Sequence, residues 1–251
     1  MKKLTAILLT GAIAASLSAC STQAEEPASL GMDLSQYTVV DISHLQEADM
    51  PADPSPAPQS DFFGRIGVDG GLHNLEVLSY CVHTGTHMDA PYHVIETGGG
   101  IDTVDPLILI GPACVVKLDV PAGSYGITVD DVKAWEEENG EIQSGEAVLF
   151  HTGHDALWET DPDEYITNYP YLLPETAQYM VGKGVRYIAM ESISRHHHHR
   201  EPPDPPGQRR RRGRERVQPG DIEADRCYTI GTFPNSQGAT GVWTRILALY
   251  P

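Results

Sequence analysis

The chain has 251 residues, of which 40% are hydrophobic, and a formal net charge of −18 at pH 7. This length allows one large domain whose core needs no disulfide bonds. Its 35 acidic residues against 17 basic ones argue against a body that binds nucleic acid or anionic lipid, so we expect no nucleic-acid partner. The basic residues are unevenly placed, since eight of the 17 are arginines between positions 195 and 216.

The first residues have the pattern of an export signal. Two lysines precede an apolar segment at 4–17, which leads through Ser18 and Ala19 directly to Cys20. The run 17–20 resembles the lipobox of bacterial lipoproteins, which implies lipidation of Cys20; a plain secreted protein is the alternative. We therefore expect an exported, lipid-anchored protein of the bacterial cell envelope, periplasmic or on the outer face of a membrane, with the anchor as its membrane contact.

The expected organisation has three parts. They are a signal peptide at 1–19, a tether at 20–34 rich in Ala, Glu, Pro and Ser, and a single domain at 35–251. Three cysteines lie in that domain, and the sequence does not decide whether any two of them pair.

The first half of the domain is predicted to consist of strands and loops. β-branched residues predict a strand at 37–42, and four prolines predict a loop at 49–59. Alternating apolar residues at 75–83 predict a strand that ends at His83, and a short apolar run predicts another strand at 113–120.

Two capped helices are expected in the second half. Thr128 is a good N-cap with Asp131 in the capping-box position, and Gly140 stops that helix. Pro174 opens the second helix as its first residue, and a pair of glycines ends it. Those glycines stand at 182 and 184, and further strands are expected at 147–151 and 185–190. The strands are too many for simple βαβ alternation, so we predict a mixed α/β fold.

Four potential metal ligands lie within eleven residues, at His83, His87, Asp89 and His93. Imidazole nitrogens and a carboxylate oxygen suit zinc or manganese. A glycine and a proline inside the stretch argue against a helix, so we expect a strand end that runs into a loop. Three ligands would leave an open position for a water whose pKa the ion lowers toward about 7, and His93 could take or give the proton. The alternatives are loop histidines bonded to the backbone, or a structural metal site.

This stretch carries a specific resemblance. Residues 83–93 match His-x-Gly-Thr-His-x-Asp-x-Pro-x-His, the signature of the cyclase family, which includes bacterial kynurenine formamidases and isatin hydrolases. Further segments that resemble the family lie at 40–43, 148–153, 184–192 and 238–248. The resemblance implies an α/β fold of the swivelling β/β/α type, with a barrel-like mixed sheet and flanking helices.

The resemblance also implies an activity and its residues. By position, His83, His87 and Asp89 would be the metal ligands and His93 the general acid/base. Family members hydrolyse amide bonds with zinc or manganese and associate as homodimers or homotetramers. The chain is therefore expected to be a metal-dependent hydrolase of C–N bonds other than peptide bonds, like arylformamidase, which hydrolyses N-formylkynurenine. Because an exported protein fits cytoplasmic tryptophan catabolism poorly, another small amide, lactam or lactone is an alternative substrate.

Two more residues are candidates for the pocket wall. The family often has an aromatic residue where His154 stands, and Trp158 follows it closely. A surface histidine and ordinary core packing are the alternative interpretations of these two side chains.

The resemblance breaks after residue 193, where the family usually continues with an Asp and this chain has Ser194. In the family a helix with a His and a strand with a Glu follow, and they complete the metal site of dinuclear members. Here residues 195–216 contain no Ala, Val, Ile, Leu, Met, Phe, Trp, Tyr or Cys, so they cannot form a buried helix and strand. We interpret 195–220 as a compensated frameshift; a genuine basic disordered insertion and an engineered tag are the alternatives. The alternative function is a catalytically impaired lipoprotein of the same fold that binds a metal or ligand.

Overall fold

The computed structural model describes residues 33–52, 56–68, 70–192 and 219–251. The expected signal peptide, Cys20 and all but the last two residues of the tether lie outside the described residues. Most of the segment expected to be anomalous, 195–220, lies outside them as well, because residues 193–218 are not described. Predictions on these segments therefore stay predictions. In the part of the chain that is described, no helix is both long and apolar enough to cross a membrane.

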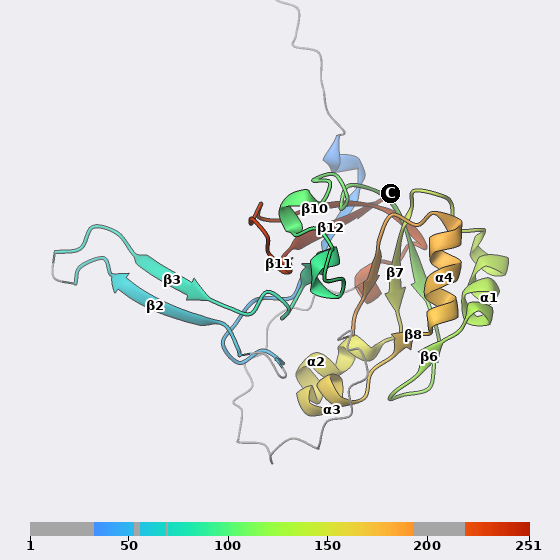
Figure 1. The fold of residues 1–251 in the computed structure, drawn as a ribbon, viewed down its shortest axis with the longest axis horizontal. Helices are drawn as coiled ribbons and strands as arrows, with labels where there is room; N and C mark the ends of the chain where they lie inside the picture. Colours follow the sequence, from blue (N-terminus) through green and yellow to red (C-terminus); the bar gives the residue numbers. More distant parts are fainter. Residues whose placement is uncertain (1–32, 53–55, 69, 193–218) are drawn as a thin grey trace, which may run out of the picture. The chain divides into compact units, whose positions relative to one another are not determined.

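A six-stranded mixed sheet forms the centre of the domain (Figure 1). Its strand order is β1-β12-β10-β5-β7-β9. Its strands are β1 (Thr38–Asp41), β5 (Gly111–Lys117), β7 (Ala147–His151), β9 (Ile188–Met190), β10 (Arg226–Thr232) and β12 (Arg245–Tyr250). The neighbours β5, β7 and β9 run parallel, and the other pairings are antiparallel. Because β1 and β9 stand at the two edges, the sheet of the described residues is open and not a closed barrel.

Two helices connect the parallel strands and pack on one face of the sheet. Helix α1 (Val129–Asn139) lies between β5 and β7 along the chain, and α4 (Pro174–Lys183) lies between β7 and β9. The buried cluster on this face includes Cys114, Val116, Val132, Trp135, Val148, Phe150 and Met180. The cluster on the opposite face includes Ala113, Val115, Ala147, Leu149, Ile222, Ile246 and Ala248. Since side chains alternate along a strand, the central strands are buried on both faces and are therefore continuously apolar.

The first long helix begins and ends where its capping signals predict. Thr128 Oγ1 accepts a hydrogen bond from the backbone N–H of Asp131 at 3.1 Å, and the Asp131 carboxylate accepts one from the backbone N–H of Thr128 at 2.8 Å. This reciprocal pair is a capping box. Helix α4 begins at Pro174 as predicted and ends before Gly184, while Gly182 lies inside it and does not end it.

The strand predicted at 75–83 is shorter than expected. It is β3 (Leu75–Ser79), which ends before His83 and pairs with β2 (Gln59–Gly64), a strand the sequence did not predict. The remaining strands and helices are β4 (His87–Asp89), β6 (Gly126–Ile127), β8 (Tyr171–Leu172), β11 (Gly241–Trp243), α2 (Leu157–Thr160) and α3 (Pro162–Thr167). Strand β4 pairs with β11, and β6 pairs with β8. The cysteines at 81, 114 and 227 are free thiols.

Candidate metal site

Strand β4 has one face toward the core and one toward the candidate site. Its middle residue, Met88, pairs with Val242 of β11, and both lie in an apolar cluster. Because side chains alternate along a strand, His87 and Asp89, on either side of Met88, point away from that cluster. The strand therefore places two of the predicted ligands on the same face.

A tight turn before β4 brings His83 to the same face. Gly85 has a φ of +60°, a left-handed conformation that glycine adopts without steric cost. A Cβ at this position would lie 2.5 Å from Nε2 of Gln46, so neither the backbone nor the space suits a larger residue. The Gly85 carbonyl also accepts a hydrogen bond from His87 Nδ1 at 2.8 Å. The turn thus positions both histidines.

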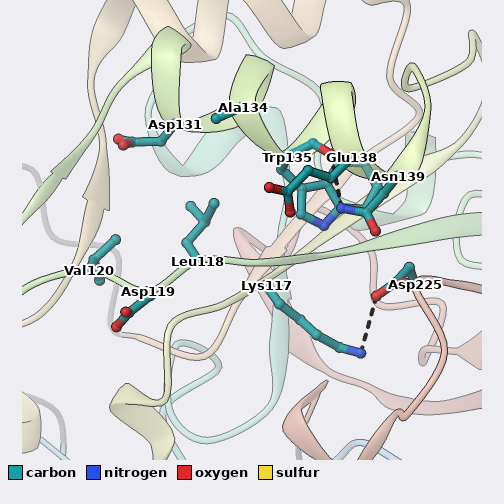
Figure 2. Close-up of a pocket in the computed structure, with 10 residues that line it drawn as sticks. All are labelled: Lys117, Leu118, Asp119, Val120, Asp131, Ala134, Trp135, Glu138, Asn139 and Asp225. Carbon is teal, nitrogen blue, oxygen red and sulfur yellow. Dashed lines mark hydrogen bonds and ion pairs between the residues drawn. The ribbon is translucent and has the colours of Figure 1, made fainter.

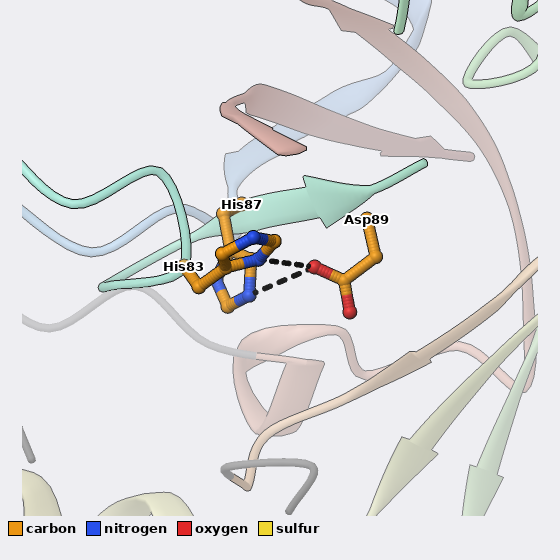
Figure 3. Close-up of side chains that lie close together, drawn as sticks. All are labelled: His83, His87 and Asp89. Atoms are coloured by element: carbon orange, nitrogen blue, oxygen red, sulfur yellow. Dashed lines mark hydrogen bonds and ion pairs between the residues drawn. The ribbon is translucent and has the colours of Figure 1, made fainter. Parts of the chain in front are cut away.

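The three side chains meet at one carboxylate oxygen (Figure 3). Asp89 Oδ1 lies 2.8 Å from His83 Nδ1 and 3.4 Å from His87 Nε2. One ligand atom from each residue lies within 4.8 Å of the other two. The nitrogens that do not face this oxygen, which we call the outer nitrogens, have partners of their own. They are His87 Nδ1, which donates to the Gly85 carbonyl, and His83 Nε2, which lies 2.9 Å from Thr240 Oγ1. We call His83, His87 and Asp89 the ligand triad.

Burial and hydrogen bonds shift the pKa values of the triad. Burial lowers the pKa of His83, although the hydrogen bond to Asp89 opposes this. Burial also acts to lower the pKa of His87, but the hydrogen bonds to Asp89 and to the backbone raise it above its ordinary value. Burial acts to raise the pKa of Asp89, but the hydrogen bonds from the histidines lower it to about 2. Asp89 is therefore ionised at neutral pH and offers a negative charge to a cation.

The ligand triad fits a divalent cation. Two imidazole nitrogens and a carboxylate oxygen are typical ligands of zinc and manganese. Ligand atoms about 2.1 Å from a tetrahedral ion are about 3.4 Å apart. The 3.4 Å between His87 Nε2 and Asp89 Oδ1 has this spacing, whereas the 2.8 Å between His83 Nδ1 and Asp89 Oδ1 is a hydrogen-bond distance. Hydrogen bonds on the outer nitrogens orient both rings, as is usual for histidines that bind a metal.

His93 lies beside the triad and is exposed. It ends the short 3₁₀-helix η2 (Pro91–His93), which follows β4 after one residue. Its ring stacks on that of His83, with the ring centroids 3.8 Å apart. An acid/base group must contact both the solvent and the site where the reaction takes place. His93 meets this requirement, because it is exposed and its ring lies against a ligand of the triad.

The two candidates for the pocket wall lie in a separate buried aromatic cluster. His154 is 5% exposed, and its Nε2 donates to the backbone oxygen of Tyr165 at 3.0 Å. Trp158 contacts the Tyr165 ring edge-on and stacks on His44, whose backbone N–H donates to Thr86 Oγ1. Trp158 therefore supports the turn that carries the triad through His44.

Thr240, which directly precedes β11, and Gly241, its first residue, contribute to the site and were not singled out from the sequence. Thr240 contacts the outer nitrogen of His83, and Gly241 leaves room for the same ring. A Cβ on Gly241 would lie 2.7 Å from His83 Cε1. Both residues belong to the segment 238–248, which resembles the family. That resemblance could have drawn attention to the segment, but no local sequence pattern indicates what these two residues do.

Three buried polar atoms near the motif have no hydrogen-bond partner among the described residues: Gln46 Oε1, Trp243 Nε1 and Thr244 Oγ1. Gln46 lies against the turn of the motif, and Trp243 is paired with His87 across the two strands. Buried polar atoms are rarely left unpaired in proteins. The surroundings of the triad thus retain hydrogen-bonding capacity for water or a bound molecule.

A second group of potential ligands consists of His151 at the end of β7, Asp155 in the 3₁₀-helix η4 (His154–Ala156) and Glu191 directly after β9. His151 Nδ1 donates to one Glu191 oxygen at 2.7 Å, and the other oxygen accepts from the backbone and hydroxyl of Thr152 and from the backbone N–H of His154. The bond to Glu191 raises the pKa of His151. Burial acts to raise the pKa of Glu191, but the bond from His151 lowers it. Because both oxygens are engaged, these contacts fasten β9 to the turn after β7.

A pocket of about 480 Å³ lies between α1 and the end of β5 (Figure 2). The carboxylates in its wall are Asp119, Asp131, Glu138 and Asp225. Asp131 serves the capping box of α1, and Asp225 pairs with Lys117 at 3.3 Å. The ligand triad does not line this pocket, so the two features are separate.

The comparison with models of protein families shows which family the chain belongs to. The Cyclase family model, described as "Putative cyclase", matches residues 40–197, which is more than half of the chain. The chain belongs to the Cyclase family. Its ligand triad and His93 lie inside the matched region.

Relatives and solved structures agree with membership of the Cyclase family. A kynurenine formamidase of Geobacillus thermodenitrificans (strain NG80-2) is 29% identical over 152 residues, which cover 61% of this chain and 67% of the relative. An isatin hydrolase of Roseibium aggregatum is 34% identical over 116 residues, which cover 41% of this chain and 44% of the relative.

The fold of the family is also seen in known structures. A crystal structure of an isatin hydrolase bound to the product analogue thioisatinate has a TM-score of 0.70 with 21% identity, covering 86% of this chain and 94% of that one. A structure described as a potential metal-dependent hydrolase with cyclase activity has a TM-score of 0.61 with 20% identity, covering 86% of this chain and 100% of that one. The predicted α/β fold with a mixed sheet is therefore confirmed.

Proposed function

We propose that this Cyclase-family chain is a metal-dependent hydrolase of amide bonds, with an arylformamidase-like activity on N-formylkynurenine or on another small amide or lactam. The observation that carries the proposal is the convergence of the ligand triad on one oxygen with the His93 ring stacked beside it. The names of the relatives, kynurenine formamidase and isatin hydrolase, support the same reaction class.

The residues of the site have distinct tasks in this proposal. The ligand triad would hold zinc or manganese, which supplies a water of lowered pKa and polarises a carbonyl oxygen. His93 would take a proton from the attacking water and return it to the leaving nitrogen.

The test compares three histidine variants of the full chain. His93→Ala should keep the bound metal and lose turnover of N-formylkynurenine and isatin by about 10²–10⁴-fold, because it removes proton transfer alone. His87→Ala should lose both metal and turnover. His73→Ala, which changes an exposed histidine outside the site, is the matched control and should change neither. Full turnover in His93→Ala would contradict the acid/base role.

The second candidate function is binding without catalysis. The observation that favours it is the composition of residues 195–216, which replaces sequence that carries metal ligands in dinuclear members of the family. A wild-type chain that binds metal and turns over no member of a panel of formamides, lactams and lactones would favour this function.

We also propose that the chain is exported and lipid-anchored at Cys20. The proposal rests on the sequence of the first twenty residues. Growth of a bacterial host with labelled palmitate should label the wild-type protein and leave Cys20→Ala unlabelled. Absence of label from the wild type would contradict it.

A further inference from the structure

The hydroxyl of Thr240 is the hydrogen-bond partner of His83 Nε2, the ring nitrogen that does not contact Asp89. Thr240 directly precedes β11, is half-buried, and places Oγ1 2.9 Å from His83 Nε2. Its backbone is held as well, because the N–H of Ala90 donates to the Thr240 carbonyl at 2.8 Å. The pairing that aligns β4 with β11 therefore also fixes the hydroxyl against the ring.

The two histidines of the ligand triad are oriented in different ways. The Gly85 carbonyl can only accept, so His87 Nδ1 carries a proton, and in the neutral ring His87 Nε2 then keeps its lone pair for a cation. A hydroxyl can both donate and accept. While His83 Nδ1 donates to Asp89 Oδ1, the Thr240 hydroxyl donates to His83 Nε2.

Metal binding requires the opposite proton arrangement on His83. To ligate through Nδ1, the neutral ring must carry its proton on Nε2, and Thr240 Oγ1 then accepts from that N–H. The contact is thus kept in both arrangements without movement of the ring. The backbone of Gly241 and the stacked ring of His93 also contact the His83 ring, but the hydrogen bond to Nε2 comes from Thr240.

We propose that Thr240 is a positioning residue, which holds His83 in the ring orientation and tautomer that bind a divalent cation through Nδ1. It acts through His83 and not on the substrate. The inference rests on the metal site of the proposed function, but it does not depend on which amide is hydrolysed.

The experiment measures Zn²⁺ affinity of the full chain by competition with a chromophoric chelator. Thr240→Val keeps the shape of the side chain and removes the hydroxyl, so affinity should fall by about 10–100-fold. Thr240→Ser restores the hydroxyl and should bind as the wild type does. Thr232→Val, an exposed position at the end of β10, is the matched control. Thr240→Ala replaces Thr240→Val if the latter fails to fold.

Three results would overturn the proposal. The first is an unchanged Zn²⁺ affinity in Thr240→Val. The second is an affinity in Thr240→Ser as weak as that in Thr240→Val, which would show that packing matters and not the hydroxyl. The third is a wild type that binds no Zn²⁺. Turnover tests the proposed function separately. A wild type that binds Zn²⁺ without hydrolysing any amide contradicts that function and leaves the role of Thr240 intact.

Discussion

Each histidine of the ligand triad is held by two partners. His87 lies between the Gly85 carbonyl and Asp89, and His83 lies between Thr240 and Asp89. The outer contacts choose which nitrogen faces the shared carboxylate oxygen, and the ionised carboxylate adds the charge that a cation needs. At the scale of single residues, the site therefore depends on hydrogen-bond partners as much as on the ligands themselves.

The ion pair of His151 with Glu191 makes the free energy of unfolding depend on pH. Glu191 has a pKa below its ordinary value of 4.5, so its contribution to the free energy of unfolding is present above pH 4.5 and lost as pH falls through the lowered pKa. His151 has a pKa above 6.5, so its contribution is present below pH 6.5 and lost as pH rises through the raised pKa. The pair should therefore stabilise the fold most between pH 4.5 and 6.5.

Glu191→Gln tests this window. The variant should lose about 2 kcal/mol of unfolding free energy at pH 5.5, because a buried charged pair is broken. The loss should be smaller at pH 9, because the contribution of the charged His151 is lost as pH rises through its raised pKa. Urea denaturation at the two pH values measures it, with exposed Glu159→Gln as control. An equal or larger loss at pH 9 would show that the pair is not the cause.

At the scale of elements, the pairing of β4 with β11 assembles the site. It points His87 and Asp89 to one face, brings Thr240 to His83, and opposes Asp89 with Gly241. A glycine is needed at position 241 because the His83 ring fills the space that a side chain there would take.

Gly241→Ala should therefore weaken metal binding. The new Cβ would lie 2.7 Å from His83 Cε1 and must displace the ring, so we expect at least a tenfold loss of Zn²⁺ affinity, comparable with loss of an outer hydrogen bond. Gly182→Ala, in α4 with open space around its Cβ, is the glycine control and should bind as the wild type does. Wild-type affinity in Gly241→Ala would mean that the ring position is not critical.

The elements differ in how far sequence could predict them. Helix α1 was predicted to the residue because its start and stop signals are local, at Thr128 and Gly140. The hairpin partner β2 was not predicted, since its residues Gln-Ser-Asp-Phe-Phe-Gly alternate poorly and begin at the end of a proline-rich loop. Ligand candidates could be named because the motif packs them into eleven residues. Thr240 could not, because it lies 157 residues from His83 along the chain.

At the scale of the whole molecule, the rest of the described chain leaves the β2–β3 hairpin largely uncovered. All residues of its two strands except Gly64 are exposed, and Phe63 and Leu72 are 68% and 80% exposed. A two-stranded hairpin alone is marginal in water, and contiguous exposed apolar side chains mark interaction surfaces. We propose that this hairpin packs against a second copy of the chain in a homodimer or homotetramer.

The double variant Phe63→Ser, Leu72→Ser tests the assembly. Light scattering after size exclusion should give a multiple of the 27.4 kDa chain mass for the full-length wild type and a smaller species for the variant, because the apolar contact is removed. Val181→Ser, which changes a valine 69% exposed on α4, controls for general loss of surface hydrophobicity. A monomeric wild type would rule the proposal out.

The basic segment 195–220 also bears on the whole molecule. It holds eight of the 17 basic residues and only three of the 35 acidic ones, so the rest of the chain is even more acidic than the total suggests. Resequencing the gene checks the frameshift interpretation, and an unbroken in-frame read of the same residues would contradict it.

Metal content tests the central claim most directly. The wild-type chain, loaded with Zn²⁺ or Mn²⁺ and dialysed, should retain at least one equivalent of metal by inductively coupled plasma mass spectrometry. Asp89→Asn and His87→Ala should each retain at least one equivalent less, because each removes a ligand from the triad. A wild type without bound metal, or variants that retain as much metal as the wild type, would contradict the account.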